Sequence, residues 1–495
     1  MSVNIIDKVI EYLSPQRAYN RLAYREAIEA RNYTAARTDD RFGNWFPRDQ
    51  PAEVTDAPYR NLIRARARDL ERNNAVLSGA VLGIVNNVIG LGIKPQAMCV
   101  STSGKELTRI NDKIEELWAE WTNAENCDIT GHSDFYALQA LFLRRMLVDG
   151  DGLIIRSTPA DRARFPLILQ MVEGDMFAEQ LTRDKDRYIY GGVEVNDYMQ
   201  PLAYHFVFDP RTYEVTRVPA ERVVHGFVKF RAQQIRGVSA LAPVMEPVRD
   251  IGQYIEYELK AARIAASLSG VIKSGTPQKI GRNMKVADSG DTSATQIEPG
   301  TMLNLRPGED ALFAQPGRPN VAASQFTQLI LRFVGVGLGL SYESVSRDVS
   351  QVNYSSAREA KLQDIKTYEA MQEFVIKKFC RPIYNAWLDA AVLGGLVNIP
   401  GYWNTPAKYR KCRWVKPGWK WVDPLKEASG TEKQLALGLT TLQEVCGAMG
   451  TDWQENLEQQ AREEQYKKDL GLQQKATTSG GDVNIGDQET DGGGN

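Results

Sequence analysis

The feature that most constrains the fold is an apolar helical segment, from Ala322 to Leu340, that carries a single charge, Arg332. A helix with so few polar residues must be covered on more than one face. A second long helix is predicted from Pro247 to Leu268, and a single chain has difficulty covering such a pair, so we expect neighbouring copies of the chain to do so. In the first segment the large apolar residues recur at steps of three and four, the spacing of one helix face: Phe326, Leu329, Ile330, Phe333, Val336 and Leu340.

A long polar stretch follows this helix. Gly335, Gly337 and Gly339 weaken the last turns, so we expect the chain to bend there. The sequence Ser356-Ala-Arg-Glu359 has the pattern of a capping box and predicts the start of another long helix, which should end at Arg381-Pro382. A polar loop held between two buried helices favours a functional role.

Composition indicates a globular protein. The 495 residues are 43% hydrophobic and 25% charged, enough for two or three cores. Five scattered cysteines without a Cys-x-x-Cys pair favour reduced thiols and exclude a zinc site of that type. The N-terminus does not have the pattern of a secretion signal. The uncharged stretch from Asn73 to Ile93 has asparagines and glycines in its middle, so a buried helix is favoured over a membrane span.

Charge limits the kind of nucleic-acid contact. The chain has 60 basic and 62 acidic residues, a net charge of −2. A protein that grips nucleic acid usually carries a basic excess, because phosphate neutralisation supplies most of the affinity. The balance therefore argues against tight DNA binding and favours a wall along which a strand can slide.

The first 235 or so residues predict an α+β domain. Helices are expected over Arg60 to Glu71, Lys105 to Trp121 and Ser133 to Val148. Arg60, Arg64 and Arg68 recur at spacing four, which favours a solvated face, with a patch facing DNA or another subunit as the alternative. Short runs between Leu153 and Phe230, such as Leu153-Ile-Ile-Arg, predict strands separated by turns.

The remainder of the chain is mostly helical. Residues 270–320 are rich in Gly, Pro and Thr and predict a small β-containing insertion between the two apolar helices. Thr431 to Gly471 is predicted to be helical again. The last residues, Ala476 to Asn495, contain almost nothing apolar and are expected to be disordered.

Several motifs, in the same order along the chain, resemble those of the lambda-like phage portal proteins. The most specific are Gly339-Leu-Ser-Tyr-Glu343, Ser346-Arg-Asp348 and Val352-Asn-Tyr-Ser-Ser-Ala-Arg358, which are similar to the family's tunnel-loop signature. The others are Arg60 to Asn74, Trp118-Ala-Glu-Trp121 with Cys127-Asp-Ile, Asp149-Gly-Asp151, Ile235 to Pro243, and Leu439-Thr-Thr-Leu442.

The resemblance implies an α+β portal fold with a mixed wing, a two-helix stem, a small β-containing clip and a helical crown. The expected divisions are an N-terminal arm (1–58), the wing (59–238), stem helix 1 (239–269), the clip (270–320), stem helix 2 (321–341), the tunnel loop (342–356), a long helix with a return to the wing (357–425), the crown (426–475) and a disordered tail (476–495).

The resemblance also implies a structural function, with no enzymatic activity and no cofactor. The protein would form a dodecameric ring at one capsid vertex and give double-stranded DNA, without sequence specificity, a channel for packaging and ejection. The expected partners are further copies of the chain, the terminase large subunit, the major capsid protein and head–tail adaptors. The ring would seed capsid assembly, assemble in the host cytoplasm and reside in the virion, with no membrane contact.

Two groups of residues are candidates for the functional sites. Neutral donors in the polar stretch can touch phosphates briefly without trapping them, although an ordinary inter-helix loop is the alternative. The basic run in the insertion suits contact with DNA or the terminase, with a solvated loop as the alternative. The tunnel-loop group is Ser344, Ser346, Arg347, Ser350, Gln351, Asn353 and Tyr354, and the clip group is Lys273, Lys279, Arg282 and Lys285.

Signals for catalysis are weak. Gly270-Val-Ile-Lys-Ser-Gly275 begins like a phosphate-binding loop but continues with Thr276-Pro277 where lysine is required. The three histidines are too few and too far apart to indicate a ligand site, so ordinary core or surface positions are favoured: His132, His205 and His225. Asp149 and Asp151 leave open a phage-associated nuclease or hydrolase, although a turn explains them equally well. A scaffolding protein that forms no ring is the other alternative.

Overall fold

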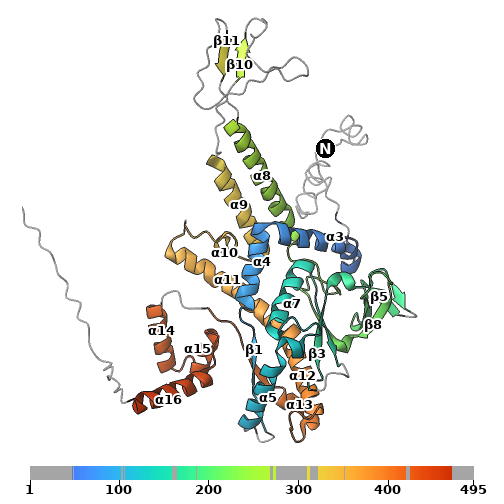
Figure 1. Ribbon diagram of the computed structural model, residues 1–495, viewed down its shortest axis with the longest axis vertical. Helices are drawn as coiled ribbons and strands as arrows, with labels where there is room; N and C mark the ends of the chain where they lie inside the picture. The colour runs from blue at the N-terminus through green and yellow to red at the C-terminus, as the bar shows by residue number, and fades with distance from the viewer. Residues whose placement is uncertain are drawn as a thin grey trace, which may run out of the picture. The chain divides into compact units, whose positions relative to one another are not determined.

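The computed structural model describes residues 47, 49–101, 104, 106–158, 164–184, 187–267, 271–274, 309–312, 321–350, 352–419 and 424–470. The chain divides into two compact units, Met1–Thr55 and Asp56–Asn495, and all contacts given below lie within the second. Its elements form the α+β architecture expected from the sequence (Figure 1). None of the helices among these residues is long and apolar enough to cross a membrane.

The N-terminal part of the described chain is helical. The uncharged stretch after Asn73 forms α4, and Asn74 caps it by accepting hydrogen bonds from the backbone N–H groups of Val76 and Leu77. One face of α4 is buried, which confirms the prediction of a helix inside the protein. The elements are α3 (Ala52–Asn73), α4 (Ala75–Val88), β1 (Lys94–Ala97), α5 (Thr108–Trp121), α6 (Ala124–Cys127) and α7 (Phe135–Asp149).

The prediction that the arginine stripe on α3 is a solvated face is wrong. Arg60 and Arg64 are buried, and Arg68 is partly buried against carboxylates, so the stripe is not a solvated face. Arginine can be buried in this way when its planar guanidinium meets carboxylates and carbonyls that satisfy its donors.

A cluster of aromatic rings occupies the larger hydrophobic core. Trp118 and Trp121 of α5 are buried together, with ring centroids 4.9 Å apart, as the periodicity of that helix predicts. The ring centroid of Trp118 also lies 5.0 Å from that of Phe135 of α7 and 5.0 Å from that of Trp387. Residues far apart in the chain thus share one core, since dispersion contacts between rings reward close packing.

Two antiparallel sheets enclose a second, smaller core. The strand order is β3-β2-β9 in one sheet and β4-β5-β6-β7-β8 in the other. Val172 and Phe206, one from each sheet, belong to this core. The strands are β2 (Gly152–Ser157), β3 (Ile168–Val172), β4 (Arg183–Asp184), β5 (Arg187–Tyr190), β6 (Val193–Val195), β7 (Pro201–Val207), β8 (Val215–Pro219) and β9 (Val223–Gly226).

Two long helices form a pair, with a short two-stranded ladder between them in the chain. The helices are α8 (Met245–Ser267) and α9 (Val321–Leu338), and the ladder joins β10 (Val271–Ser274) to β11 (Glu309–Leu312). α8 and α9 lie side by side (Figure 1). Tyr254 of α8 meets Phe326 of α9 edge-on, with ring centroids 5.3 Å apart. Both helices agree with their predicted positions.

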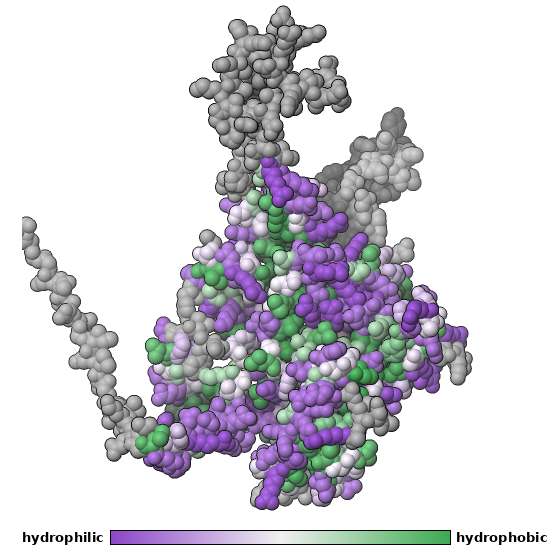
Figure 2. Space-filling model, in the orientation of Figure 1, coloured by the Kyte–Doolittle hydropathy of each residue, from purple (hydrophilic) through white to green (hydrophobic). Residues whose placement is uncertain are grey.

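The helix pair leaves a large apolar surface open. Val248 and Ile251 of α8 and Val334 of α9 are buried, but apolar residues on other faces are not. Figure 2 shows apolar surface over the α8–α9 pair. We call this surface the open stripe; it comprises Ile255 and Leu259 of α8 and Phe326, Leu329, Phe333 and Val336 of α9.

The helix after the polar stretch is longer than predicted. α11 (Tyr354–Val375) continues through a π-helical segment (Ile376–Cys380) into α12 (Arg381–Leu393). The prediction that Arg381-Pro382 ends the helix is therefore wrong. A proline is tolerated in a first turn, where its missing N–H is not needed, and Pro382 lies in the first turn of α12, directly after the π-helical segment.

The C-terminal part consists of short elements. Thr441 and Glu444 form a capping box at the start of α15, in which each side chain bonds the other residue's backbone N–H. Helices occur within the stretch predicted to be helical. The elements are α13 (Pro406–Tyr409), β12 (Cys412–Val415, paired with β1), α14 (Pro424–Ala436), α15 (Leu442–Ala448) and α16 (Trp453–Asp469).

Candidate functional site

The turn at the end of α9 is built by glycines. Gly339 has a φ of +69°, the left-handed conformation that commonly ends helices. The backbone N–H of Leu340 donates to the carbonyl of Gly335 at 2.8 Å and closes the turn. A Cβ at Gly337 would lie only 2.4 Å from Cγ1 of Val244, so glycine there permits close packing. The bend predicted at these glycines is confirmed, and close packing is an additional reason for them.

A short helix, α10 (Tyr342–Ser346), follows the turn and is tied to α11 by a buried carboxylate. Asp364 of α11 is 3% exposed. Its carboxylate accepts hydrogen bonds from the N–H of Ser341 at 2.7 Å, the hydroxyl of Ser341 at 2.7 Å and the hydroxyl of Ser344. One turn further along α11, the hydroxyl of Thr367 donates to the carbonyl of Gly339 at 3.0 Å. We call this group of residues the Asp364 latch.

The loop between α10 and α11 covers residues 347–353. Arg347 adopts the left-handed conformation (φ +57°) and its N–H donates to the carbonyl of Glu343 at 2.8 Å. Asp348 accepts from the N–H of Ser350 at 3.0 Å. Hydrogen bonds from Ser350 hold the pKa of Asp348 below its usual value. Val349, between them, is 65% exposed.

The loop is therefore shorter than the predicted stretch of 342–356. Ser344 and Ser346 belong to α10, and the hydroxyl of Ser344 points to Asp364. Arg347, Ser350 and Asn353 are exposed, while Gln351 lies outside the described residues.

The start of α11 corrects another prediction. Asn353 is the cap of this helix, because its side-chain oxygen accepts from the N–H of Ser356 at 2.9 Å. Tyr354 is the first helical residue. The capping box predicted at Ser356 and Glu359 is wrong, since both residues lie inside the first turns of the helix.

Two hollows adjoin the Asp364 latch. One has a volume of about 370 Å³ and is lined by Ser344, Val349, Lys361 and Trp419, among others. The other has a volume of about 380 Å³ and is lined by residues including Val336 and Thr367. Ser341 and Asp364 line both, so the latch forms the wall between them.

The structure places only one of the clip candidates. Lys273 lies on β10, where its Cα pairs with that of Asp310 on β11. The others, Lys279, Arg282 and Lys285, lie outside the described residues.

Asp149 and Asp151 are engaged by arginines. Arg68 forks onto Asp149, with its Nε 2.8 Å from Oδ1 and its Nη2 2.7 Å from Oδ2. Arg236, which is fully buried, donates from Nε to Oδ2 of Asp151 at 2.8 Å, and the N–H of Gly237 donates to Oδ1 at 2.7 Å. The hydrogen-bonding capacity of both carboxylates is thus directed to structural partners.

The charges around Asp151 shift its pKa and that of its histidine neighbour. Burial alone would raise the pKa of Asp151, but Arg236, His225 and the Gly237 N–H outweigh it and hold the pKa well below the usual range. Nε2 of His225 lies 2.9 Å from Oδ1 of Asp151. Burial lowers the pKa of His225, so the imidazole is neutral at neutral pH.

No group of three or more His, Cys, Asp or Glu side chains that could hold a metal ion occurs within the part of the chain that the structure describes. His205 pairs with a carboxylate, since its Nε2 lies 3.2 Å from Oε2 of Glu194. The role of Asp149 and Asp151 that the geometry supports is to hold α3, the start of β2 and the segment before α8 together.

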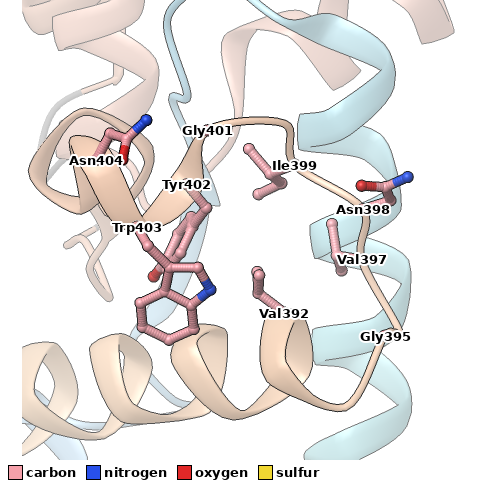
Figure 3. Close-up of a pocket in the computed structure, with 9 residues that line it drawn as sticks. All are labelled: Val392, Gly395, Val397, Asn398, Ile399, Gly401, Tyr402, Trp403 and Asn404. Atoms are coloured by element: carbon pink, nitrogen blue, oxygen red, sulfur yellow. The ribbon is translucent and has the colours of Figure 1, made fainter.

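A separate hollow lies near the end of α12 (Figure 3). Its volume is about 510 Å³, and Tyr402 and Trp403 face Val392 across it. The hydroxyl of Tyr402 is already used, because it donates to Asp389. All the lining residues are uncharged: Val392, Gly395, Val397, Asn398, Ile399, Gly401, Tyr402, Trp403 and Asn404.

Comparison with known proteins identifies the family. A profile described as "Phage portal protein, lambda family" matches residues 38–372. The chain belongs to the lambda family of phage portal proteins. It is 23% identical over 468 residues to the probable portal protein of Halomonas phage phiHAP-1, a match that covers 91% of this chain and 89% of that protein. It is 22% identical over 481 residues to portal protein B of Escherichia phage lambda, a match that covers 88% of this chain and 89% of that protein.

Among solved structures, the portal chain is similar to a chain from the neck of a native gene transfer agent particle. The TM-score is 0.44 with 11% sequence identity, and the match covers 78% of this chain and 93% of that chain.

The sequence reasoning missed the Asp364 latch of this portal protein, although a signal for it exists. The buried residues of α11 include Asp364, Tyr368, Gln372 and Val375, at helical spacing. A carboxylate on the buried face of a helix requires polar partners. That pattern predicts a bonded group at Asp364 without naming its partners.

Proposed function

We propose that this portal protein forms a ring of twelve copies at one capsid vertex and that DNA passes through its channel during packaging and ejection. The open stripe on α8 and α9 carries this proposal. Contiguous apolar surface exposed to water is unfavourable by roughly 25 cal/mol for each Å². Neighbouring copies, each presenting the same two helices, cover such a surface on both sides when the ring closes.

The function is mechanical rather than enzymatic. The net charge of −2 suits a channel that guides DNA, because a strongly basic wall would hold the phosphates. The loop from Arg347 to Asn353 narrows the channel and offers mostly neutral donors to the backbone of the passing DNA. In this proposal Ser344 and Ser346, in α10, support the loop. Gln351 and Tyr354 are the remaining members of the tunnel-loop group.

The remaining parts contact other proteins of the particle. In this proposal the clip, with Lys273, Lys279, Arg282 and Lys285, docks the terminase and later the head–tail adaptors. The wing and the crown face the major capsid protein, and the ring starts capsid assembly in the host cytoplasm before it becomes part of the virion.

The ring is tested with two matched variants of the purified full-length chain. Val336 of α9 is 77% exposed within the open stripe, and Leu393 at the end of α12 is 79% exposed outside it. We expect Val336→Glu to abolish rings, because it places a charge at a desolvated interface. Leu393→Glu should leave them intact. Negative-stain microscopy and mass photometry measure the outcome; annular particles in Val336→Glu, or only single molecules in the wild type, would contradict the proposal.

The loop is tested separately. Replacing residues 348–352 with a Gly/Ser linker of the same length keeps the Asp364 latch and the Asn353 cap of α11, and it should leave rings intact. We expect this variant to package or retain less DNA in a packaging assay. Normal packaging would remove the loop from the mechanism while leaving the ring untouched.

A further inference from the structure

We propose that Asp364 is a positioning residue that fixes α10, and through it the loop of residues 347–353. The effect on DNA passage rests on the proposed function, whereas the positioning itself does not. Asp364 is the only member of the Asp364 latch that touches both Ser341 and Ser344. It therefore joins the beginning and the middle of α10 to a single point on α11.

The hydroxyl of Ser341 links the carboxylate of Asp364 to the backbone of α10. A serine hydroxyl has one proton to donate and lone pairs with which to accept. Ser341 donates its proton to Asp364 at 2.7 Å, and its oxygen accepts from the N–H of Ser344 at 3.2 Å. The carboxylate thus orients the hydroxyl that caps α10. Loss of Asp364 would remove three hydrogen bonds and leave that hydroxyl free to rotate.

Apolar packing alone holds α10 less firmly. Val345 is the buried apolar side chain of this helix, packed in the larger core. The two hollows of about 370 and 380 Å³ adjoin the latch, so there is space beside it. The ring of Tyr342 also lies against α9, with Cζ of Arg332 5.6 Å from the ring centroid. A five-residue helix held by these two side-chain contacts can still shift unless its polar bonds prevent it.

The position of the loop follows from that of α10. Arg347 and Asp348 continue directly from α10 through their bonds to Glu343 and Ser346. The other end of the loop is fixed by Asn353, the cap of α11. Asp364 and Asn353 therefore attach both ends of the loop to α11. Removing Asp364 releases the end that follows α10.

Hydrogen exchange on the assembled full-length protein tests the inference. We expect Asp364→Ala to speed exchange of the Ser341, Ser344 and Arg347 amides by at least about fivefold. Asp364→Asn keeps one acceptor and should give a smaller increase. Glu359→Gln is the matched control, because it removes a carboxylate from the same helix whose bond is to Gln363. It should change these rates by less than about twofold.

A general loss of stability would look different. In that case exchange would rise equally in α7, which lies in the larger core, and a spin label at Tyr198→Cys would gain mobility along with one at Val349→Cys. The inference requires the gain at Val349→Cys alone. If Asp364→Ala does not fold, Ser344→Ala, which removes one donor to the carboxylate, should give the same local pattern with a smaller amplitude.

The two proposals fail separately. Unchanged exchange in α10 of Asp364→Ala overturns the latch whatever happens to packaging. Faster exchange with normal packaging supports the latch and counts against a role of the loop in DNA passage.

Discussion

Arginines without access to solvent determine much of the interior of this protein. Arg236 reaches Asp151, the carbonyl of Gly191 at 2.6 Å and the ring of Phe177, with its Cζ 3.6 Å from the ring centroid. A planar guanidinium can satisfy several acceptors in one plane and still stack on a ring. This side chain therefore joins the segment before α8 to both sheets.

We predict that Arg236→Met lowers the free energy of unfolding by about 3–5 kcal/mol, because it leaves the carboxylate of Asp151 buried without its cation. Urea denaturation monitored by circular dichroism measures this. Arg211→Met is the matched control, since Arg211 is an exposed arginine paired with Asp209. It should not change the midpoint. Equal midpoints for both variants would show that the buried pair contributes nothing.

At the scale of elements, local hydrogen bonds decide where helices begin and end. Asn353 and Ser356 are both residue types that favour caps, and only the geometry shows that Asn353 is the cap of α11. In the same way, the glycines at the end of α9 serve different purposes, a left-handed turn at Gly339 and close packing at Gly337.

The cap assignment predicts different effects for two neighbouring substitutions. Asn353→Ala should destabilise the protein by about 1 kcal/mol, because the N–H of Ser356 loses its acceptor. Ser356→Ala should be neutral or slightly stabilising, since alanine is favoured inside a helix. Thermal denaturation of the two variants measures this; the reverse order would restore the capping box at Ser356.

The glycine assignment can be tested with another pair. Gly337→Ala should be destabilising by about 1–3 kcal/mol, because the new Cβ meets Val244. Gly83 lies in α4, where a Cβ added to it would meet nothing within 4 Å apart from its chain neighbours and the backbone of its own helix. There the same change should stabilise the helix by up to about 1 kcal/mol. Opposite shifts in the melting temperature are expected, and a stabilising Gly337→Ala would refute the packing argument.

At the scale of the whole molecule, buried charges couple stability to pH. The hydrogen bond and charge of Arg217 lower the pKa of Glu194 to about 2, and the partners of Asp151 hold its pKa below the usual range. Both groups add stability that is present above their unfolded pKa values and is lost as the pH falls through the folded values. His225 has a lowered pKa, so the unfolded chain takes up a proton before the folded chain does.

Stability should therefore fall in two stages on acidification. We expect a plateau above about pH 6.5, a modest decline below it caused by His225, and a steep loss from about pH 4.5 towards pH 2 as the carboxylates protonate. The denaturation midpoint as a function of pH measures both stages. His225→Gln should remove the first stage only; a decline of equal size in this variant would assign it to another group.

Prediction from the sequence succeeded where the information is local. The periodicity of α8 and α9 and the short apolar runs of β2 and β3 depend on neighbouring residues, and these elements lie where expected. The arginine stripe was misjudged because its partners are distant: Arg68 bonds Asp149, 81 residues away. The Asp364 latch likewise depends on which side of α11 faces α10, which no spacing within either segment reveals.

The few residues just before α8 have a mechanical consequence. Ile235 belongs to the smaller core, Leu241 and Val244 belong to the larger one, and Arg236 lies between the sheets. A force applied along α8 would thus be divided between two hydrophobic cores that pack separately. Pulling α8 away from the rest of the chain would require both cores to lose contacts together.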